Sequence, residues 1–128
     1  MKKLLPILLS ALMFTGCAGT NNNKNNTYRQ ITMDEAVNIM AQETGYIILD
    51  VRRPDEFAAG HIPGAINVAN ESIGTDEIPE LPDKEQLIMV YCRSGRRSKE
   101  ASEKLVKLGY TNIVEFGGII DWEYEIVK

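Results

Sequence analysis

Cysteine, histidine and tryptophan are scarce in this sequence, which has 128 residues but only two, one and one of them, respectively. So few sulfur and imidazole ligands exclude the clustered metal sites that zinc proteins build, and no glycine-rich P-loop for a nucleotide is present. We therefore expect no metal and no cofactor. Because two cysteines are too few for a disulfide framework, the fold has to depend on an apolar core, which a domain of about 100 residues can form.

Positive charge is limited and unevenly distributed. The chain carries 14 Lys and Arg residues against 18 Asp and Glu residues, a formal net charge of −4, which argues against a nucleic-acid partner. Five of the six arginines, however, lie in segments 52–53 and 93–97. This clustering favours a locally positive site for a small anion over ordinary solvated surface charge. The composition, 44% hydrophobic and 25% charged, is typical of one globular domain, and we expect a monomer.

The N-terminal apolar run is too short to cross a membrane. Residues 4–14 follow a basic start and would span about 16 Å as a helix, against a hydrocarbon core of about 30 Å. Thr15 and Gly16 then lead to Cys17, an order that predicts a signal peptide over residues 1–16. Residues 14–17 resemble the bacterial lipobox, which implies that Cys17 is lipidated. An ordinary secretory leader with an incidental cysteine is the alternative.

The segment that follows is polar and rich in asparagine. Residues 17–27 show no apolar period, so we expect a lipidated cysteine and a flexible linker, with the folded domain over residues 28–128. This organisation predicts an extracytoplasmic protein that a lipid anchors to the bacterial cell membrane or outer membrane. Cys92 would then be the remaining thiol, and an unpaired cysteine in an oxidising compartment calls for a functional explanation.

Helix and strand patterns alternate along the domain. Thr32 and Glu35 form a capping box that starts a helix ending before Gly45. Further helices are expected at 55–59, at 98–108 and around Trp122, strands at 46–51, 65–68, 86–91 and 113–116, and an irregular segment at 71–83. This alternation predicts the α/β class, with a mainly parallel sheet flanked by helices on both faces.

The residues best suited to chemistry lie in the loop after the strand at 86–91. Ligands of open α/β sheets bind beyond the carboxyl ends of the strands, where consecutive N–H groups and the positive end of the next helix attract anions. Cys92 is expected to be stabilised there as a thiolate, and after sulfuration as a persulfide anion. An inert buried cysteine is the alternative. The candidate anion-binding residues are Arg93, Ser94, Gly95 (which permits a positive φ), Arg96, Arg97 and Ser98.

Five motifs in order resemble the signature of single-domain rhodaneses. They are residues 49–52 (LDVR), 56–57 (EF), 60–67 (GHIPGAIN), 91–98 (YCRSGRRS) and 117–119 (GGI) with Trp122. The resemblance covers residues 28–128 and implies a rhodanese-like fold with a central five-stranded sheet. It also implies that Cys92 takes a sulfane sulfur from a small anionic donor such as thiosulfate, releases sulfite, and passes the sulfur to cyanide or a thiol.

Loop length separates this sequence from related phosphatases. Their signature loop is one residue longer, whereas four residues separate Cys92 from Arg97, which makes a smaller cradle suited to sulfur. A phosphatase or arsenate reductase is therefore the less favoured alternative. Glu56 stands where two-domain thiosulfate enzymes carry a substrate-binding arginine. We therefore expect thiosulfate to be a poor donor, with Arg93 and Arg96 supplying the charge at the rim.

The residues that support the loop are expected to be mainly structural. Asp50 and Arg52 end a strand near the site, and we expect Asp50 to bond backbone groups and Arg52 to pair with Glu56. For Arg97 the sequence leaves two roles open, contact with the anion or an ion pair with a local carboxylate. His61 lies in a turn motif and is not expected to act as a base, because the loop itself stabilises the thiolate.

The sequence thus predicts a thiosulfate sulfurtransferase-type enzyme that works through a Cys92 persulfide. The alternative from another class is a non-catalytic rhodanese-fold module that binds a partner or carries sulfur at the cell envelope. An intact Cys92 favours the enzyme, and detection of added sulfur on this residue would separate the two hypotheses.

Overall fold

The structure, a computed structural model, describes residues 27–128. The predicted signal peptide (residues 1–16), the lipidation of Cys17 and almost all of the predicted linker lie outside the described residues and stay predictions. Within the part of the chain that is described, no helix is both long and apolar enough to cross a membrane.

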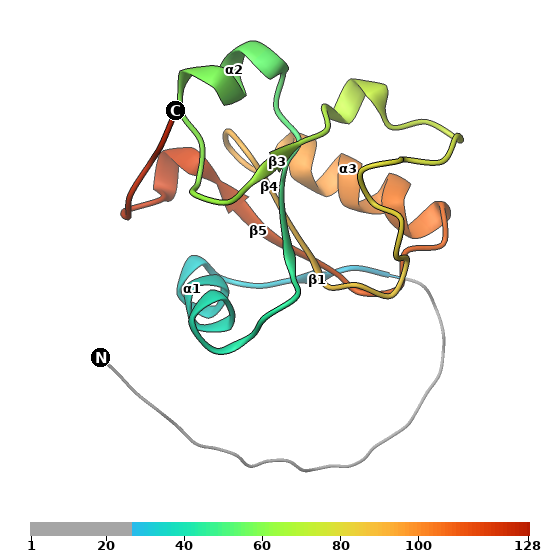
Figure 1. Cartoon of the computed structure of the whole chain (residues 1–128), viewed down its shortest axis with the longest axis horizontal. Helices are drawn as coiled ribbons and strands as arrows, with labels where there is room; N and C mark the ends of the chain where they lie inside the picture. Colours follow the sequence, from blue (N-terminus) through green and yellow to red (C-terminus); the bar gives the residue numbers. More distant parts are fainter. Residues whose placement is uncertain (1–26) are drawn as a thin grey trace.

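A five-stranded parallel sheet forms the centre of the domain (Figure 1). Its strand order is β1-β5-β4-β2-β3, and every neighbouring pair is parallel, which confirms the expected sheet. The carboxyl ends of the three central strands therefore meet at one edge. The strands are β1 (Arg29–Gln30), β2 (Ile47–Asp50), β3 (Ile66–Asn67), β4 (Ile88–Cys92) and β5 (Ile113–Gly118).

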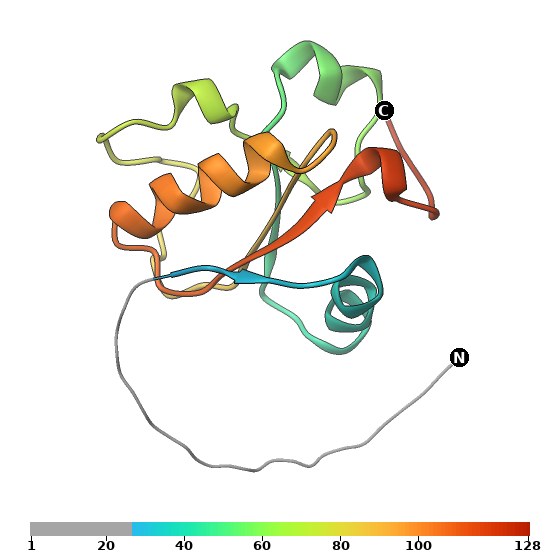
Figure 2. The same cartoon turned by 180° about the vertical axis from the view of Figure 1, so that it is seen from behind.

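Helices lie on both faces of the sheet, as the alternating pattern predicted (Figures 1 and 2). Helix α1 (Met33–Gln42) packs on one face and α3 (Arg96–Lys107) on the other, while α2 (Pro54–Ala59) follows β2 beyond the carboxyl edge. The predicted capping box of α1 is confirmed. Thr32 Oγ1 accepts the Glu35 N–H at 3.0 Å, and Glu35 Oε1 accepts the Thr32 N–H at 2.8 Å.

Strand β4 is buried on both faces, which explains its continuous apolar run. Its side chains alternate between two apolar clusters. Ile88, Val90 and Cys92 belong to the cluster that includes residues of α3, whereas Met89 and Tyr91 belong to the cluster that includes α1. Cys92 is thus directed towards the face that α3 covers.

Strand β5 carries a charged residue in its buried middle. Val114 and Phe116 lie in the cluster on the α1 side, so Glu115 between them faces α3. Glu115 is 2% exposed. A carboxylate tolerates such burial only when hydrogen-bond donors or a cation lie next to it.

Two boundaries near the loop differ from the expected ones. Helix α3 begins at Arg96 rather than Ser98, because Gly95 adopts a φ of +108° and turns the chain directly into the helix. Strand β5 continues to Gly118, paired there with Cys92. Only residues 93–95 therefore connect β4 to α3.

Two other elements differ from the sequence pattern. The two-residue strand β1 was not expected from the pattern, since both of its residues are exposed and only their pairing with β5 defines the strand. In place of a helix around Trp122 there is a 3₁₀ turn, Ile119–Asp121, that ends at this residue. The irregular segment 71–83 is confirmed, with a single 3₁₀ turn at Asn70–Ser72.

Gly118 is required by a close approach of the cysteine loop. A Cβ at this position would overlap the carbonyl oxygen of Arg93 and lie 2.6 Å from the Cα of Ser94. The φ of Gly118 is −132°, which any residue adopts, so the constraint is purely steric. We predict that Gly118→Ala lowers the free energy of unfolding by about 1–3 kcal/mol through overpacking, measured by urea denaturation.

Gly74→Ala provides the matched control for this measurement. An added Cβ at Gly74 meets no atom within 4 Å, so the change in unfolding free energy should stay within about 0.5 kcal/mol. Equal stability of the two variants would contradict the steric assignment of Gly118.

Candidate active site

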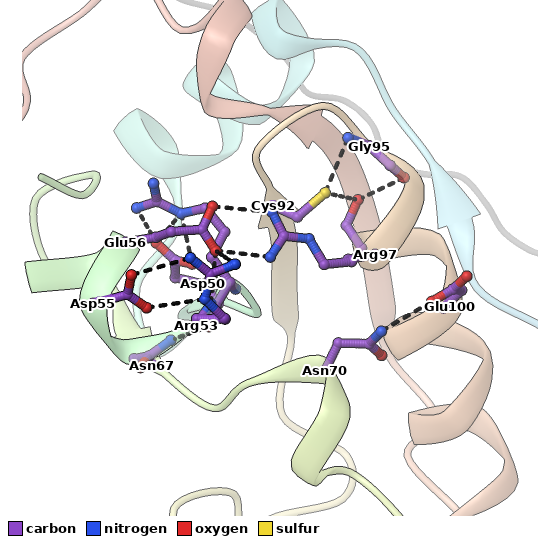
Figure 3. Close-up of polar contacts among 12 residues, drawn as sticks. Asp50, Arg53, Asp55, Glu56, Asn67, Asn70, Cys92, Gly95, Arg97 and Glu100 are labelled. Carbon is purple, nitrogen blue, oxygen red and sulfur yellow. Dashed lines mark hydrogen bonds and ion pairs between the residues drawn. The ribbon is translucent and has the colours of Figure 1, made fainter. Parts of the chain in front are cut away.

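Cys92 is the last residue of β4, and its sulfur faces the start of α3 (Figure 3). The residue is 1% exposed and its thiol is free. The Gly95 N–H donates a hydrogen bond to Cys92 Sγ at 2.9 Å. The backbone of residues 92–94 returns this N–H group to the sulfur. Gly95 itself has a positive φ, a conformation that glycine permits, and this turns the chain from the loop into α3.

The positive end of α3 lies directly at this sulfur. The first N–H groups of a helix have no intrahelical acceptors, and the aligned peptide dipoles add a partial positive charge at the same end. Since α3 begins right after Gly95, this end of the helix favours a negative charge on Cys92. Such an arrangement stabilises a thiolate, and equally a persulfide anion.

A buried serine and a buried glutamate extend the site behind the sulfur. Cys92 Sγ lies 3.4 Å from Ser98 Oγ, and the Ser98 hydroxyl donates a short hydrogen bond to Glu115 Oε2. The Gly117 N–H donates to the same carboxylate oxygen at 3.0 Å. Ser98 belongs to the predicted loop, whereas Glu115 was missed. The available signal was a charged residue inside the apolar strand at 113–116.

The three arginines of the loop differ in their partners. Arg97 donates two hydrogen bonds to Glu56 of α2, at 2.8 and 3.1 Å (Figure 3), whereas Arg96 pairs with Glu100 at 2.9 Å on the exposed side of α3. Arg93 is exposed and forms no ion pair within residues 27–128. Arg97 thus takes one of its two expected roles, pairing with a carboxylate, although the partner comes from another helix rather than from a neighbouring position.

The pair between Arg97 and Glu56 is largely shielded from solvent, with each side chain 17% exposed. The hydrogen bonds from Arg97 lower the pKa of Glu56 to about 2. The backbone N–H of Arg53 adds a further hydrogen bond to Glu56 at 3.0 Å. Glu56 is therefore ionised at neutral pH and compensates the charge of Arg97, so the loop is less positive than its three arginines suggest.

Asp50 and Arg52 form a buried ion pair, with Arg52 Nη2 2.7 Å from Asp50 Oδ2. The predicted pair between Arg52 and Glu56 is therefore wrong, since the Arg52 guanidinium turns back to Asp50 and Glu56 binds Arg97 instead. Asp50 Oδ1 also accepts the backbone N–H of Arg52 at 2.9 Å, which agrees with the structural role expected of Asp50.

Tyr91, which precedes Cys92, joins this pair to the turn after α2 and was not singled out from the sequence. Its hydroxyl donates to Asp50 Oδ2 at 2.6 Å and accepts the Ile62 N–H at 3.1 Å. Arg52 Nη2 also donates to the Gly60 carbonyl at 2.6 Å. Burial raises the pKa of Tyr91, so the hydroxyl remains a donor. The network fixes the strand that ends in Cys92.

His61 belongs to the same turn and makes structural contacts. Its Nδ1 lies 2.9 Å from the Phe57 carbonyl oxygen, and its ring stacks on that of Phe57 at 3.8 Å between centroids. Its backbone pairs with Val127 and so holds the C-terminal segment. In the described part of the chain, no group of three or more His, Cys, Asp or Glu residues is placed to hold a metal ion.

Comparison with known proteins places this geometry in a family. The sequence model of the rhodanese-like domain matches residues 32–125. The chain belongs to the rhodanese-like domain family. It is 37% identical over 80 residues to thiosulfate sulfurtransferase PspE of Escherichia coli (strain K12), an alignment that covers 62% of this chain and 77% of that protein. It is also 38% identical over 89 residues to the chloroplastic thiosulfate sulfurtransferase 16 of Arabidopsis thaliana, covering 61% and 74%.

A solved structure shares the fold of this rhodanese-like domain. A rhodanese with anions from E. coli superposes with a TM-score of 0.59 and 35% identity, over 65% of this chain and 98% of that chain. The family and the fold that the five motifs indicated are therefore confirmed.

The ion pair between Glu56 and Arg97 predicts that this rhodanese-like domain loses stability at acid pH. Folding lowers the pKa of Glu56 from 4.5 to about 2. The stabilisation is therefore fully present above pH 4.5 and is lost as the pH falls through about 2. We expect Glu56→Gln to lower the free energy of unfolding at pH 7 by up to about 3 kcal/mol.

Urea denaturation of both proteins at neutral pH and at several acid values measures this difference. It should shrink as the pH decreases, because the wild-type carboxylate becomes protonated. Asp55→Asn, on the same helix, is the control, since Asp55 pairs with Arg53 on the exposed surface and exposed pairs contribute little. A difference between wild type and Glu56→Gln that is constant at all pH values would contradict the assignment.

Proposed function

We propose that this chain is a sulfurtransferase, which moves a sulfane sulfur from a donor to cyanide or a thiol through a persulfide on Cys92. The observation that carries the proposal is the position of the Cys92 sulfur, at the positive end of α3 and 2.9 Å from the Gly95 nitrogen. Relatives at 37% and 38% identity are named thiosulfate sulfurtransferases, which supports the same class of reaction here.

The reaction follows in two displacement steps. The Cys92 thiolate attacks the sulfane sulfur of the donor, a new S–S bond forms, and the leaving group departs with the electron pair of the broken bond. With thiosulfate the leaving group is sulfite. Cyanide or a thiolate then attacks the terminal sulfur, and Cys92 leaves as a thiolate. Both forms of Cys92 are anions, so the same N–H group and helix end favour each of them.

A non-catalytic binding or sulfur-carrier module is the second candidate. The observation in its favour is the burial of Cys92, which is 1% exposed. If a sulfur donor does not reach this buried thiol, Cys92 has only a structural role. The two candidates differ in whether Cys92 gains sulfur from a small donor.

Replacement of Cys92 tests the proposal directly. Cys92→Ala and Cys92→Ser in the full chain are expected to abolish thiocyanate formation from thiosulfate and cyanide, because the loop between β4 and α3 then has no sulfur on which the persulfide can form. Mass spectrometry should find one added sulfur atom on Cys92 of the wild type after exposure to a sulfane donor. Ser102→Ala is the control, since the buried Ser102 hydroxyl has no hydrogen-bond partner among residues 27–128 and its loss should leave activity unchanged.

Two results would contradict this assignment. Thiocyanate formation that survives in Cys92→Ala would exclude the persulfide mechanism. A folded wild type that gains no sulfur from several donors would favour the non-catalytic module.

The donor preferred by this site is proposed to carry less charge than thiosulfate. Thiosulfate is a dianion, but Glu56 compensates the charge of Arg97 and Glu100 that of Arg96. Arg93 remains as the cation of the loop that forms no ion pair within residues 27–128. A site with so little net positive charge attracts a dianion weakly, so the persulfide of a small thiol fits it better.

Glu56→Gln should change this preference, because it removes the negative charge that faces Arg97. We expect the ratio of kcat/KM for thiosulfate to kcat/KM for cysteine persulfide to rise about tenfold, which corresponds to about 1.4 kcal/mol of differential binding. The ratio does not depend on the fraction of folded enzyme. Asp55→Asn carries the same change of charge on α2 and should keep the wild-type ratio. An unchanged ratio in Glu56→Gln would refute the role of this residue.

A further inference from the structure

A buried acid lies one hydroxyl group away from the reacting sulfur, and the two displacement steps give it no task. Ser98 is fully buried and Glu115 is 2% exposed. Cys92 Sγ lies 3.4 Å from Ser98 Oγ, and Ser98 Oγ contacts Glu115 Oε2. The thiol, the hydroxyl and the carboxylate thus form a continuous hydrogen-bonded row from β4 through α3 to β5.

The direction of the hydrogen bonds in this row is decided by the Ser98 proton. Three acceptors lie within reach of the hydroxyl: the Gly95 carbonyl at 3.0 Å, the Gly117 carbonyl at 3.4 Å and the Glu115 carboxylate. The carboxylate is the charged and nearest acceptor, so it forms the strongest bond. The lone pairs of Ser98 Oγ then face the Cys92 thiol and accept its proton.

Glu115 is poorly compensated by positive charge. Lys99 Nζ lies 3.8 Å from Glu115 Oε1, and its side chain is 45% exposed, so solvent screens this pair. On the β1 side lies the Tyr28 phenol, whose pKa is raised mainly by burial, with Glu103 and Glu115 adding to the effect. From α3, Arg97 acts on Cys92 electrostatically. Within the described residues, the hydrogen-bond donors to Glu115 are thus the Ser98 hydroxyl and the Gly117 N–H, and no cation lies within hydrogen-bond distance.

We infer that Glu115 takes the proton of Cys92 through Ser98, an inference that rests on the proposed sulfur transfer. The thiol proton moves to Ser98 Oγ while the Ser98 proton moves to Glu115 Oε2. A thiol and a carboxylate become a thiolate and a carboxylic acid. The buried site holds one negative charge before and after, so the thiolate forms without placing two anions side by side. Ser98 touches the reacting sulfur, and Glu115 is a positioning residue that acts through it.

The same single charge persists through the sulfur transfer. The thiolate bonds to the sulfane sulfur of the donor, whose own bond to that sulfur breaks with its electron pair retained by the leaving group. A persulfide anion then stands beside the protonated Glu115. After the acceptor has removed the terminal sulfur, the Cys92 thiolate regains its proton from Glu115 through Ser98.

The pH dependence of Cys92 alkylation by iodoacetamide tests this inference, because it reports the thiolate without a sulfur donor. The reaction is followed in the full chain by mass spectrometry of the peptide that contains Cys92. A shared proton predicts two steps: a plateau in the neutral range, where the proton is distributed between sulfur and carboxylate, and a second rise when it leaves. Glu115→Gln should give a single rise.

The expected difference is largest at mildly acid pH. In Glu115→Gln the side chain can no longer take the thiol proton, and only the Gly95 N–H and the helix end still favour the thiolate, so alkylation at mildly acid pH should be at least about tenfold slower than that of the wild type. The glutamine can still accept the Gly117 N–H, which preserves the fold. Ser98→Ala should lower the plateau, and Ser98→Thr, which keeps a hydroxyl, should restore it.

Glu103→Gln is the matched control, an exposed acid on the same helix as Ser98, and should give the wild-type profile. A single-step profile in the wild type, or a two-step profile in Glu115→Gln, would overturn the inference. Because alkylation needs no sulfur donor, absent sulfur transfer together with a two-step profile would refute the proposed function alone.

Discussion

The connection between β4 and α3 is the constraint on which the site depends. A strand buried on both faces has to turn within residues 93–95 into a helix that covers one of those faces. The turn is possible because Gly95 has a positive φ and because Gly118 leaves room for the Arg93 carbonyl. The result places the sulfur of the last strand residue against the first turn of the helix. Residues 93–95 therefore both reverse the chain and bring an N–H group to the sulfur.

Charge compensation then decides what kind of anion the site accepts. A loop with three arginines suggests strong attraction for any anion, but Arg97 is held by Glu56 and Arg96 by Glu100. Glu115 adds a buried negative charge on the far side of the sulfur. The backbone dipoles lie close to the sulfur, since the Gly95 N–H is 2.9 Å from Cys92 Sγ and α3 begins at the next residue, and the effect of such dipoles falls off over a short distance. This balance of charge is the basis of the proposed preference for a donor with less charge than thiosulfate.

The sequence predicted those features that depend on neighbouring residues. The capping box at Thr32, a glycine at position 95 that permits a positive φ, and a buried strand that leads into Cys92 follow from local patterns, and each is present. The side-chain partners did not follow, because they join residues far apart in the chain. Arg97 and Glu56 are 41 positions apart. Asp50 lies only two positions from Arg52, but the choice of Arg52 between Asp50 and Glu56 depends on Arg97, which comes from the distant helix α3 and binds Glu56.

Other misses have a different physical origin. Strand β1 has two exposed residues and exists only through its pairing with β5, so it has no apolar period to detect. Glu115 was visible as a charged residue within an apolar strand, but its link to Cys92 depends on α3, which places the Ser98 hydroxyl in hydrogen-bond contact with it. A charged residue in a buried strand therefore indicated that a hydrogen-bonding partner exists, but the sequence did not identify that partner.

The last two residues of β4 each lie near a buried carboxylate. The two carboxylates differ in their bonding partners, and we assign the first a structural role and the second a role in proton transfer. Tyr91 meets Asp50 on the α1 side, where Arg52 pairs with that carboxylate at 2.7 Å and two N–H groups complete its shell. Cys92 meets Glu115 on the α3 side through a hydroxyl, with the nearest cation 3.8 Å away and partly in solvent. Asp50 is thus held by a cation at hydrogen-bond distance, whereas the donors to Glu115 are a hydroxyl and one backbone N–H. Asp50 therefore fixes the strand, and Glu115 is the acid placed to exchange a proton with the sulfur.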